Sequence, residues 1–258
     1  MTKKRIPVCA LFLMVLLMIF PLCVSAAAPT VQEVESLIAS IGTVSRENRT
    51  AVEQAVNAYY QLDEAAKSQV SNYAVLAEAQ QILGIQDALA KLTHEHDNVD
   101  EIDTWFSPLV EGNDNIAMVP AIYFDYFDGP GYPIMALMFY YEGDDFITLS
   151  SAKVRTDGYR YTLGSFDFID ATTEIKDKKI IHYSYGFSLV EEFEYNMLLD
   201  VLDSEEVIVR LIGNAAQKLP VTVDYTLTES DYEAINDTMY AYHLMCQADY
   251  STLLKAIA

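Results

Sequence analysis

Apolar residues recur at two different spacings in this chain, and the change of spacing constrains what it can fold into. Between residues 31 and 92 they recur every three or four positions, which is typical of helices that bury one face. From residue 116 onward, runs of β-branched and aromatic residues alternate with turn residues, which predicts strands. We therefore expect an α+β protein. An N-terminal three- to four-helix bundle would precede an antiparallel β-sheet or sandwich domain with packed helices.

The helical part contains an irregular stretch at residues 63–76. Asp63 is expected to cap a short helix, because a carboxylate accepts hydrogen bonds from first-turn N–H groups. Asn72 tolerates left-handed backbone and is expected to reverse the chain before a last helix. The inward-facing residues expected for this part are Val31, Val34, Leu37, Ile38, Ile41, Val52, Ala55, Val56, Tyr59, Leu62, Tyr73, Leu76, Ala79, Ile82 and Leu83.

Residues 31–83 resemble a known helical module, and residues 37–80 carry the resemblance. The shared skeleton consists of Leu37-Ile38, Ile41-Gly42, Val44, Ala55, Tyr59, Leu62, Lys67, Val70, Asn72-Tyr73, Leu76 and Ala79. This skeleton is similar to that of a small module in surface and secreted proteins of Gram-positive bacteria (Firmicutes). The resemblance implies a spacer or interaction module on an exported protein, and it implies no catalytic residues.

Residues 1–26 have the three-part layout of a secretory signal peptide. Lys3, Lys4 and Arg5 precede an apolar run, which ends in small residues at Ala26. The alternative is that the run stays in place as a membrane anchor, because its length could just span a bilayer. With cleavage, we expect a secreted or cell-surface protein without a stable membrane span.

The charge balance excludes two classes of partner. The chain has 16 Lys and Arg against 38 Asp and Glu, and loss of the signal would change the net charge from −22 to −25. Such a polyanion repels nucleic acid and anionic lipid. Cys246 would be the one cysteine left, so no intrachain disulfide could form, and we expect it to be a buried, inert thiol.

An acidic stretch separates the two patterns. Residues 93–115 are predicted to be a linker and lead-in between a helical module at 27–92 and a β-rich domain at 116–258. The linker contains His94, His96 and Asp97, whose imidazole and carboxylate groups are suitable ligands for zinc or calcium. The alternative to a metal site is a solvated acidic linker.

The β-rich part predicts strands at 116–127, 133–142, 146–155, 159–169, 179–189, 206–213 and 221–227. Asp157-Gly158 is a good two-residue hairpin turn. Helices are expected near 189–204 and from Thr228 onward, where Asp231 permits a capping box. The patterns R-x-D-G-x-R-Y and V-x-V-R-L-x-G resemble β-rich domains of uncharacterised bacterial exported proteins, a resemblance that implies no function.

Catalytic motifs do not stand out in the sequence. Ser150 and Lys153 fit S-x-x-K, but they lie in a strand-like run, and His182 and His243 occupy separate apolar stretches, where half-buried structural roles are expected. We expect no enzymatic activity and no cofactor. The favoured function is a non-catalytic cell-envelope protein that acts through protein–protein contacts. The alternative is an extracellular glycan-binding module that uses exposed aromatic residues at Trp105, Tyr123, Tyr126 and Tyr141.

The signal peptide leads to a direct prediction. N-terminal sequencing of secreted protein should begin within a few residues of Ala27, because signal peptidase cuts after small residues of the kind found at Ala26. Recovery of the intact chain with Met1, held in the membrane fraction, would show that the segment is an anchor instead.

Overall fold

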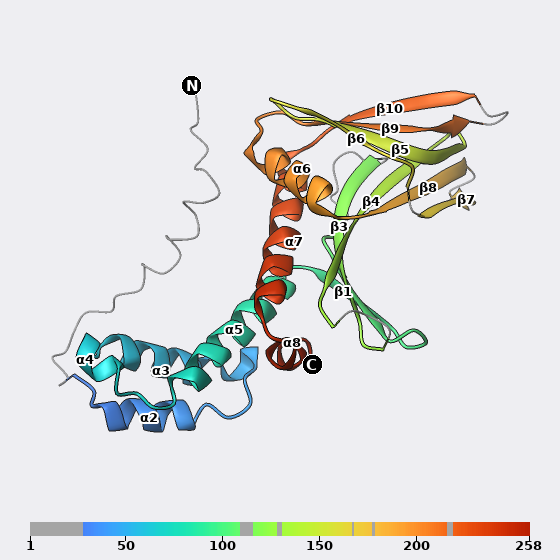
Figure 1. Ribbon diagram of the computed structural model, residues 1–258. Coiled ribbons are helices and arrows are strands. Elements are labelled where there is room, and N and C mark those ends of the chain that lie inside the picture. The colour runs from blue at the N-terminus through green and yellow to red at the C-terminus, as the bar shows by residue number, and fades with distance from the viewer. Residues whose placement is uncertain (1–27, 109–115, 128–130, 167, 177–178, 216–218) are drawn as a thin grey trace. The chain divides into compact units, whose positions relative to one another are not determined.

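The computed structural model describes residues 28–258 apart from 109–115, 128–130, 167, 177–178 and 216–218 (Figure 1). In these residues the chain is α+β, with helices and two antiparallel sheets. Two compact units are present. Lys91–Tyr242 form the sheet unit, and the described residues before Lys91 join His243–Ala258 in the helical unit. The expected signal peptide lies outside the described residues.

The helical unit begins with a run of helices. They are α2 (Val31–Ala39), the 3-10 helix η1 (Arg46–Asn48), α3 (Arg49–Tyr60), α4 (Glu64–Lys67) and α5 (Tyr73–Leu89). Thr30 and Glu33 form a capping box on α2. Asp63 accepts the N–H of Ala66 at 2.8 Å, which confirms the predicted cap of α4.

One apolar cluster links these helices, and it follows the predicted helical spacing. Its buried members are Val34, Ile38, Ile41, Val52, Ala55, Leu62, Val70, Leu76, Ala79 and Leu83. Leu37, Val56 and Tyr59 are partly buried against it. Tyr73 departs from the prediction, because its ring is 39% exposed.

The junction between α4 and α5 corrects one expectation. Asn72 has φ −104° and is not left-handed. The junction is held by Glu35 of α2. Its carboxylate accepts the backbone N–H of Ser71 at 2.8 Å and the Ser71 hydroxyl at 2.6 Å, and its carbonyl accepts the side-chain amide of Asn72 at 2.9 Å. Contacts distant in sequence therefore set this turn, and left-handed backbone is not needed.

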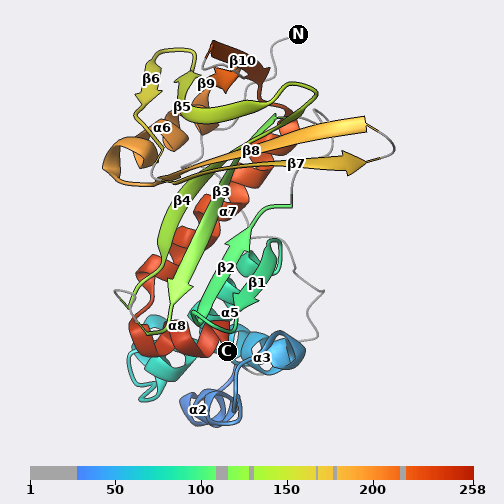
Figure 2. The ribbon, with the colours of Figure 1, turned by 90° about the vertical axis from the view of Figure 1, so that its right-hand side faces the viewer.

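The sheet unit contains two antiparallel sheets (Figure 2). The larger has the order β1-β2-β3-β4-β8-β7, with β1 (Thr93–Asp97), β2 (Ile102–Phe106), β3 (Ile116–Asp125), β4 (Ile134–Gly143), β7 (Phe168–Lys176) and β8 (Lys179–Leu189). The smaller has the order β10-β9-β5-β6, with β5 (Ile147–Arg155), β6 (Arg160–Leu163), β9 (Ile208–Ala215) and β10 (Pro220–Thr226). The helices α6 (Glu192–Asp203) and α7 (Glu229–Gln247) follow β8 and β10.

The predicted linker is wrong for residues 93–106, which form the β1–β2 hairpin. Thr93 pairs with Phe106, and Asp97 pairs with Ile102. β1 is exposed along its whole length and has no alternating apolar side chains to identify it as a strand. It lies at the edge of the sheet, where polar residues are tolerated because one side of the strand faces water.

The single strand predicted at 159–169 is also wrong, because the chain changes sheets within it. β6 ends at Leu163 in the smaller sheet, and β7 begins at Phe168 in the larger one. Phe166 lies at the crossing. Its N–H donates to the carbonyl of Ser150 at 3.0 Å, and its ring stacks on Phe139 with centroids 5.0 Å apart.

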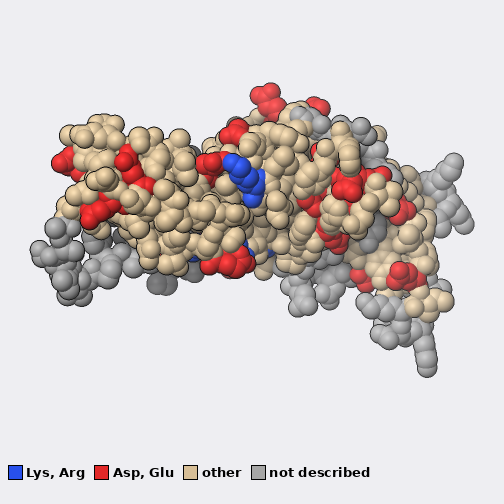
Figure 3. Space-filling view, turned by 90° about the horizontal axis from the view of Figure 1, so that it is seen from below, with Lys and Arg blue, Asp and Glu red and all other residues tan. Residues whose placement is uncertain are grey.

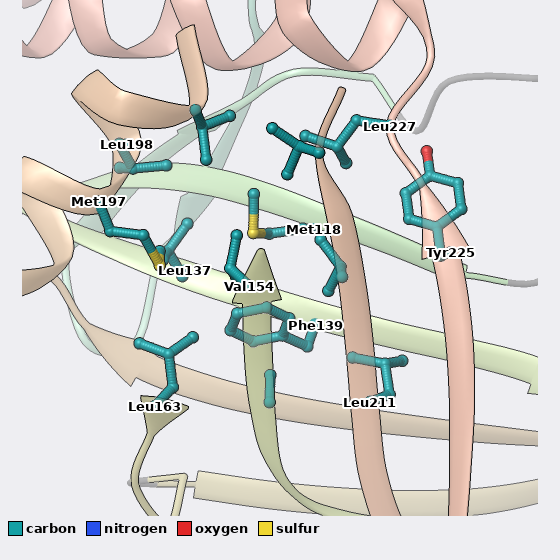
Figure 4. Close-up of a cluster of buried hydrophobic side chains, with 14 of the residues drawn as sticks. Met118, Leu137, Phe139, Val154, Leu163, Met197, Leu198, Leu211, Tyr225 and Leu227 are labelled. Atoms are coloured by element: carbon teal, nitrogen blue, oxygen red, sulfur yellow. The ribbon is translucent and has the colours of Figure 1, made fainter. Parts of the chain in front are cut away.

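Side chains of both sheets and of α6 and α7 share one apolar core (Figure 4). Its buried members include Met118, Leu137, Phe139, Val154, Leu163, Phe166, Met197, Leu198, Leu211, Tyr225, Leu227 and Ile235. A polar link crosses between the sheets within it: the fully buried Ser184 of β8 accepts the N–H of Leu149 of β5 at 3.0 Å. The finer descriptions, a β-sandwich here and a helical bundle in the other unit, stay predictions.

The C-terminal segment corrects the predicted domain 116–258. The final helix is interrupted, so α7 is followed by α8 (Tyr250–Ile257), whose first turn is capped by Asp249. The residues from His243 onward belong to the helical unit. There Lys255 of α8 forms an ion pair with Glu78 of α5 at 2.5 Å, and Leu253 and Ala256 are buried. At the start of α7, Thr228 and Asp231 form the predicted capping interaction.

The contact of Phe166 with β8 gives a prediction. A Cβ atom added to Gly186 would overlap the ring of Phe166, which is packed on Phe139 and has little room to move. Gly186→Ala should lower the free energy of unfolding by about 1–3 kcal/mol, the usual cost of overpacking a core. Gly164→Ala is the matched control, because a Cβ there meets nothing within 4 Å. Equal denaturant midpoints for both variants would contradict this account of the core.

Candidate functional site

Two histidines and a tyrosine meet at one buried carboxylate in the sheet unit. β1 places His94 and His96 on one face of the strand, because alternate residues point the same way. Asp103 lies opposite His96 on β2 and is 3% exposed. Its Oδ1 is 2.7 Å from His94 Nε2 and 2.9 Å from His96 Nδ1, and its Oδ2 accepts the hydroxyl of Tyr126. We call these four residues the Asp103 network.

The packing fixes the charge state of Asp103. Burial disfavours the ionised carboxylate, but hydrogen bonds from Tyr126, His94 and His96 outweigh it and hold the pKa of Asp103 below its usual value. An ionised carboxylate only accepts hydrogen bonds. The facing ring nitrogens of His94 and His96 must therefore each carry a hydrogen. The network is a fixed set of donors around one anion.

The three residues predicted to hold a metal, His94, His96 and Asp97, are engaged in hydrogen bonds. One nitrogen of each imidazole faces Asp103. Asp97 instead shapes the β1–β2 turn, because its Oδ1 accepts the N–H groups of Val99 at 2.8 Å and Asp100 at 3.1 Å. Across the described ranges, no group of three or more His, Cys, Asp or Glu side chains is placed to hold a metal ion. The geometry gives both histidines a hydrogen-bonding role.

The four aromatic residues predicted to bind glycans do not make an exposed platform. Trp105 and Tyr141 are buried. Trp105 stacks on His94 with ring centroids 5.0 Å apart. Tyr123 is half-buried and packs edge-on against Phe187, and Tyr126 is tied to Asp103. Trp105 and Tyr141 therefore lie inside the sheet unit, and Tyr126 belongs to the Asp103 network.

Exposed aromatic rings gather elsewhere, first in the helical unit. Tyr59, Tyr60 and Tyr73 form what we call the tyrosine cluster. The rings of Tyr59 and Tyr73 stack with centroids 4.6 Å apart, and Tyr60 packs edge-on against Tyr59 at 5.7 Å. Tyr60 is 54% exposed and Tyr73 39%. Sequence analysis assigned Tyr59 and Tyr73 to the buried face and did not single out Tyr60.

A lysine completes the tyrosine cluster. The ammonium of Lys67 lies 6.0 Å from the ring centroid of Tyr59 and 5.6 Å from that of Tyr60. The same ammonium is 2.7 Å from the carboxylate of Glu64. An ammonium over a tyrosine face is attracted by the negative charge of the π cloud. Lys67 therefore contacts both rings and Glu64, and it is not an isolated surface charge.

A second exposed aromatic group lies where β6 and α6 adjoin in the sheet unit (Figure 2). Tyr159 and Tyr161 have ring centroids 6.2 Å apart, and Phe193 of α6 packs edge-on against Tyr161 at 5.6 Å. Tyr159 is 65% exposed and Phe193 49%. The Tyr161 hydroxyl donates to the carboxylate of Asp200 on α6. We call Tyr159, Tyr161 and Phe193 the β6–α6 aromatic cluster.

A shallow groove between α2 and α3 is lined mainly by neutral polar side chains. The amides come from Gln32 of α2 and from Gln54, Asn57 and Gln61 of α3, over apolar contacts from Leu37 and Ala58. Primary amides both donate and accept hydrogen bonds, so the groove suits uncharged polar groups. Its lining also includes Glu33, whose carboxylate accepts the hydroxyl of Thr30 at 2.9 Å within the capping box of α2.

The remaining reactive side chains are placed as follows. Ser150 lies at the bulge in β5 and donates to the carbonyl of Ile212, while Lys153 is exposed, so S-x-x-K has no catalytic geometry here. His182 and His243 are half-buried, as expected, and contact Thr173 and Gln247 respectively. Cys246 is exposed, which corrects the expectation of a buried thiol.

Comparison with protein-family models, with curated proteins and with solved structures gives no match to this chain. Among the helices of the described residues, none combines the length and the apolar character needed to cross a membrane.

The Asp103 network predicts a pH dependence of stability. A pKa that is lower in the folded state means that Asp103 contributes stability above its unfolded pKa, about 3.9, and loses it as the pH falls through the folded value. Asp103→Asn should cost about 2–4 kcal/mol at pH 7, because it removes a hydrogen-bonded buried anion. The difference from wild type should shrink below about pH 4.

Urea unfolding at pH 7 and pH 3 measures this effect. Asp100→Asn is the matched control, because Asp100 is an exposed carboxylate in the same hairpin. A wild-type advantage over Asp103→Asn that is equally large at both pH values would rule out the proposed charge state.

Proposed function

We propose that this chain is an exported, non-catalytic protein of the cell envelope that acts through protein–protein contacts. The N-terminal layout and the resemblance of residues 37–80 to modules of Gram-positive surface proteins support export. On this proposal the helical unit is a small helix bundle that serves as a contact module, and the sheet unit is a β-sandwich with packed helices.

The tyrosine cluster is the observation that carries the proposal. Exposed tyrosines are enriched at the energetic centres of protein interfaces, where they supply contact area and a hydroxyl. Tyr60 and Tyr73 are exposed, yet the stack with Tyr59 and the ammonium of Lys67 restrict their motion. Rings that are already ordered lose little conformational entropy on binding. A surface of this kind favours contact with another protein.

The charge of the chain narrows the class of partner. Acidic residues exceed basic ones by 22 over the whole sequence, and Figure 3 shows acidic side chains spread over the face it presents, with few basic ones. Opposite charge on a partner speeds association and suppresses wrong partners. We therefore expect a neutral or basic protein surface, and neither nucleic acid nor an anionic membrane.

The glycan-binding alternative has weaker support. Two of the four aromatic residues that suggested it are buried, and the other two are engaged with Phe187 and Asp103. Retention of the chain on wall polysaccharide in the experiment below would support glycan binding.

The prediction concerns the exposed rings. Replacing Tyr60 and Tyr73 together with Ala should reduce recovery of cross-linked envelope proteins by about ten-fold or more, because two interface tyrosines commonly contribute 1–2 kcal/mol each. The measurement is quantitative cross-linking of the purified chain to an envelope extract, with thermal unfolding as the folding check. Phe127→Ala with Tyr132→Ala is the matched control, because both rings are exposed in the sheet unit.

Each outcome bears on one function. Loss of the same proteins with the tyrosine variant, but not with the control, supports protein contacts through the cluster. Equal recovery with both variants contradicts a role for the cluster. Retention of the chain on purified wall polysaccharide, with no cross-linked protein, would favour the glycan alternative.

A further inference from the structure

The β6–α6 aromatic cluster combines π faces with an anion. Asp200 holds the hydroxyl of Tyr161, so a carboxylate lies at the tip of that ring. Burial, followed by the hydrogen bond and the charge of Asp200, raises the pKa of Tyr161 to about 12. Tyr161 is therefore a neutral donor at physiological pH, and the charge at this place belongs to Asp200.

The surroundings of the cluster are acidic. Glu191, Glu192 and Glu194 lie at the start of α6, next to Phe193. Arg160 lies between the two tyrosines in sequence, but strand alternation directs it to the opposite face of β6 from Tyr161. No lysine or arginine stacks on the three rings of the cluster in the part of the chain that the structure describes.

The helical unit also combines two tyrosine rings with a carboxylate, and there a lysine ammonium lies beside them. There Lys67 lies over the rings of Tyr59 and Tyr60, and its ammonium pairs with Glu64 at 2.7 Å. In the β6–α6 aromatic cluster, Tyr159 and Tyr161 correspond to the two rings, and Asp200 corresponds to the carboxylate. A cation is favoured over a neutral group at such a surface, because both the π clouds and the carboxylate attract positive charge.

We propose that the β6–α6 aromatic cluster, with Asp200, is a docking site for a lysine side chain of a basic partner protein. This inference rests on the proposed function and names the chemistry of the partner. The net charge of −22 draws a basic surface toward the molecule, and the cluster gives its lysine a specific place. Lysine fits because its long apolar stem can lie on Phe193 while its ammonium reaches Asp200.

Binding of a fluorescent hexalysine peptide to the purified full chain tests the site. The isosteric Asp200→Asn variant keeps an acceptor for Tyr161 and removes the charge. Tyr159→Leu and Phe193→Leu keep apolar surface and remove the π face. Each variant should weaken binding by about two- to five-fold, the range expected for an exposed cation–π contact or ion pair. Tyr132→Leu, at an exposed ring outside the cluster, should leave binding unchanged.

Two further probes separate the alternatives. Hexalysine with acetylated side chains should not bind, because acetylation removes the charge. A neutral oligosaccharide that bound in its place, and was lost with the same Leu variants, would overturn the proposal in favour of a sugar site.

Failure of this site can be told apart from failure of the proposed function. If hexalysine does not bind, or binds all variants equally through diffuse charge, the lysine site is wrong. The cross-linking result at Tyr60 and Tyr73 would still decide separately whether the chain acts through protein contacts.

Discussion

The sheet unit depends on Phe166, which lies where the chain passes from one sheet to the other. Its ring rests on Phe139 of β4 and over Gly186 of β8, and its N–H is tied to β5 through the carbonyl of Ser150. One residue thus connects three strands from both sheets. Because the core beside it is shared by both sheets, α6 and α7, the positions of these helices follow from the same packing.

Much of the fold could be predicted from local pattern. Apolar spacing identified α2, α3 and α5, and the side chain of Asp63 identified the cap of α4, because both signals lie within one or two turns of the chain. The crossing at Phe166 could not be predicted, because alternation continues through Gly164 as though one strand ran on. The β1 strand could not be predicted because all of its residues are exposed, so its sequence lacks the alternating apolar residues that identify a strand.

The sites show the same division between local and distant contacts. Spacing by two places His94 and His96 on one face, and this could be read from the sequence. Asp103 accepts hydrogen bonds from both histidines because the β1–β2 register places it opposite His96. That register could not be predicted, because the sequence of this stretch resembles a linker. Likewise, alternation along a strand places Tyr159 and Tyr161 on one face, but Phe193 and Asp200 reach them only because α6 packs beside β6. Exposure was the least predictable property, as Trp105 and Cys246 demonstrate.

The wholly polar β1 strand also affects how copies of this protein encounter one another. An edge strand exposes unpaired backbone N–H and C=O groups that could extend the sheet into a neighbouring molecule. Here such growth would bring the carboxyl side chains of Glu95 and Asp97 into an intermolecular ladder and strip their water. The polar composition of β1 therefore disfavours extension of the sheet into a neighbouring molecule at this edge.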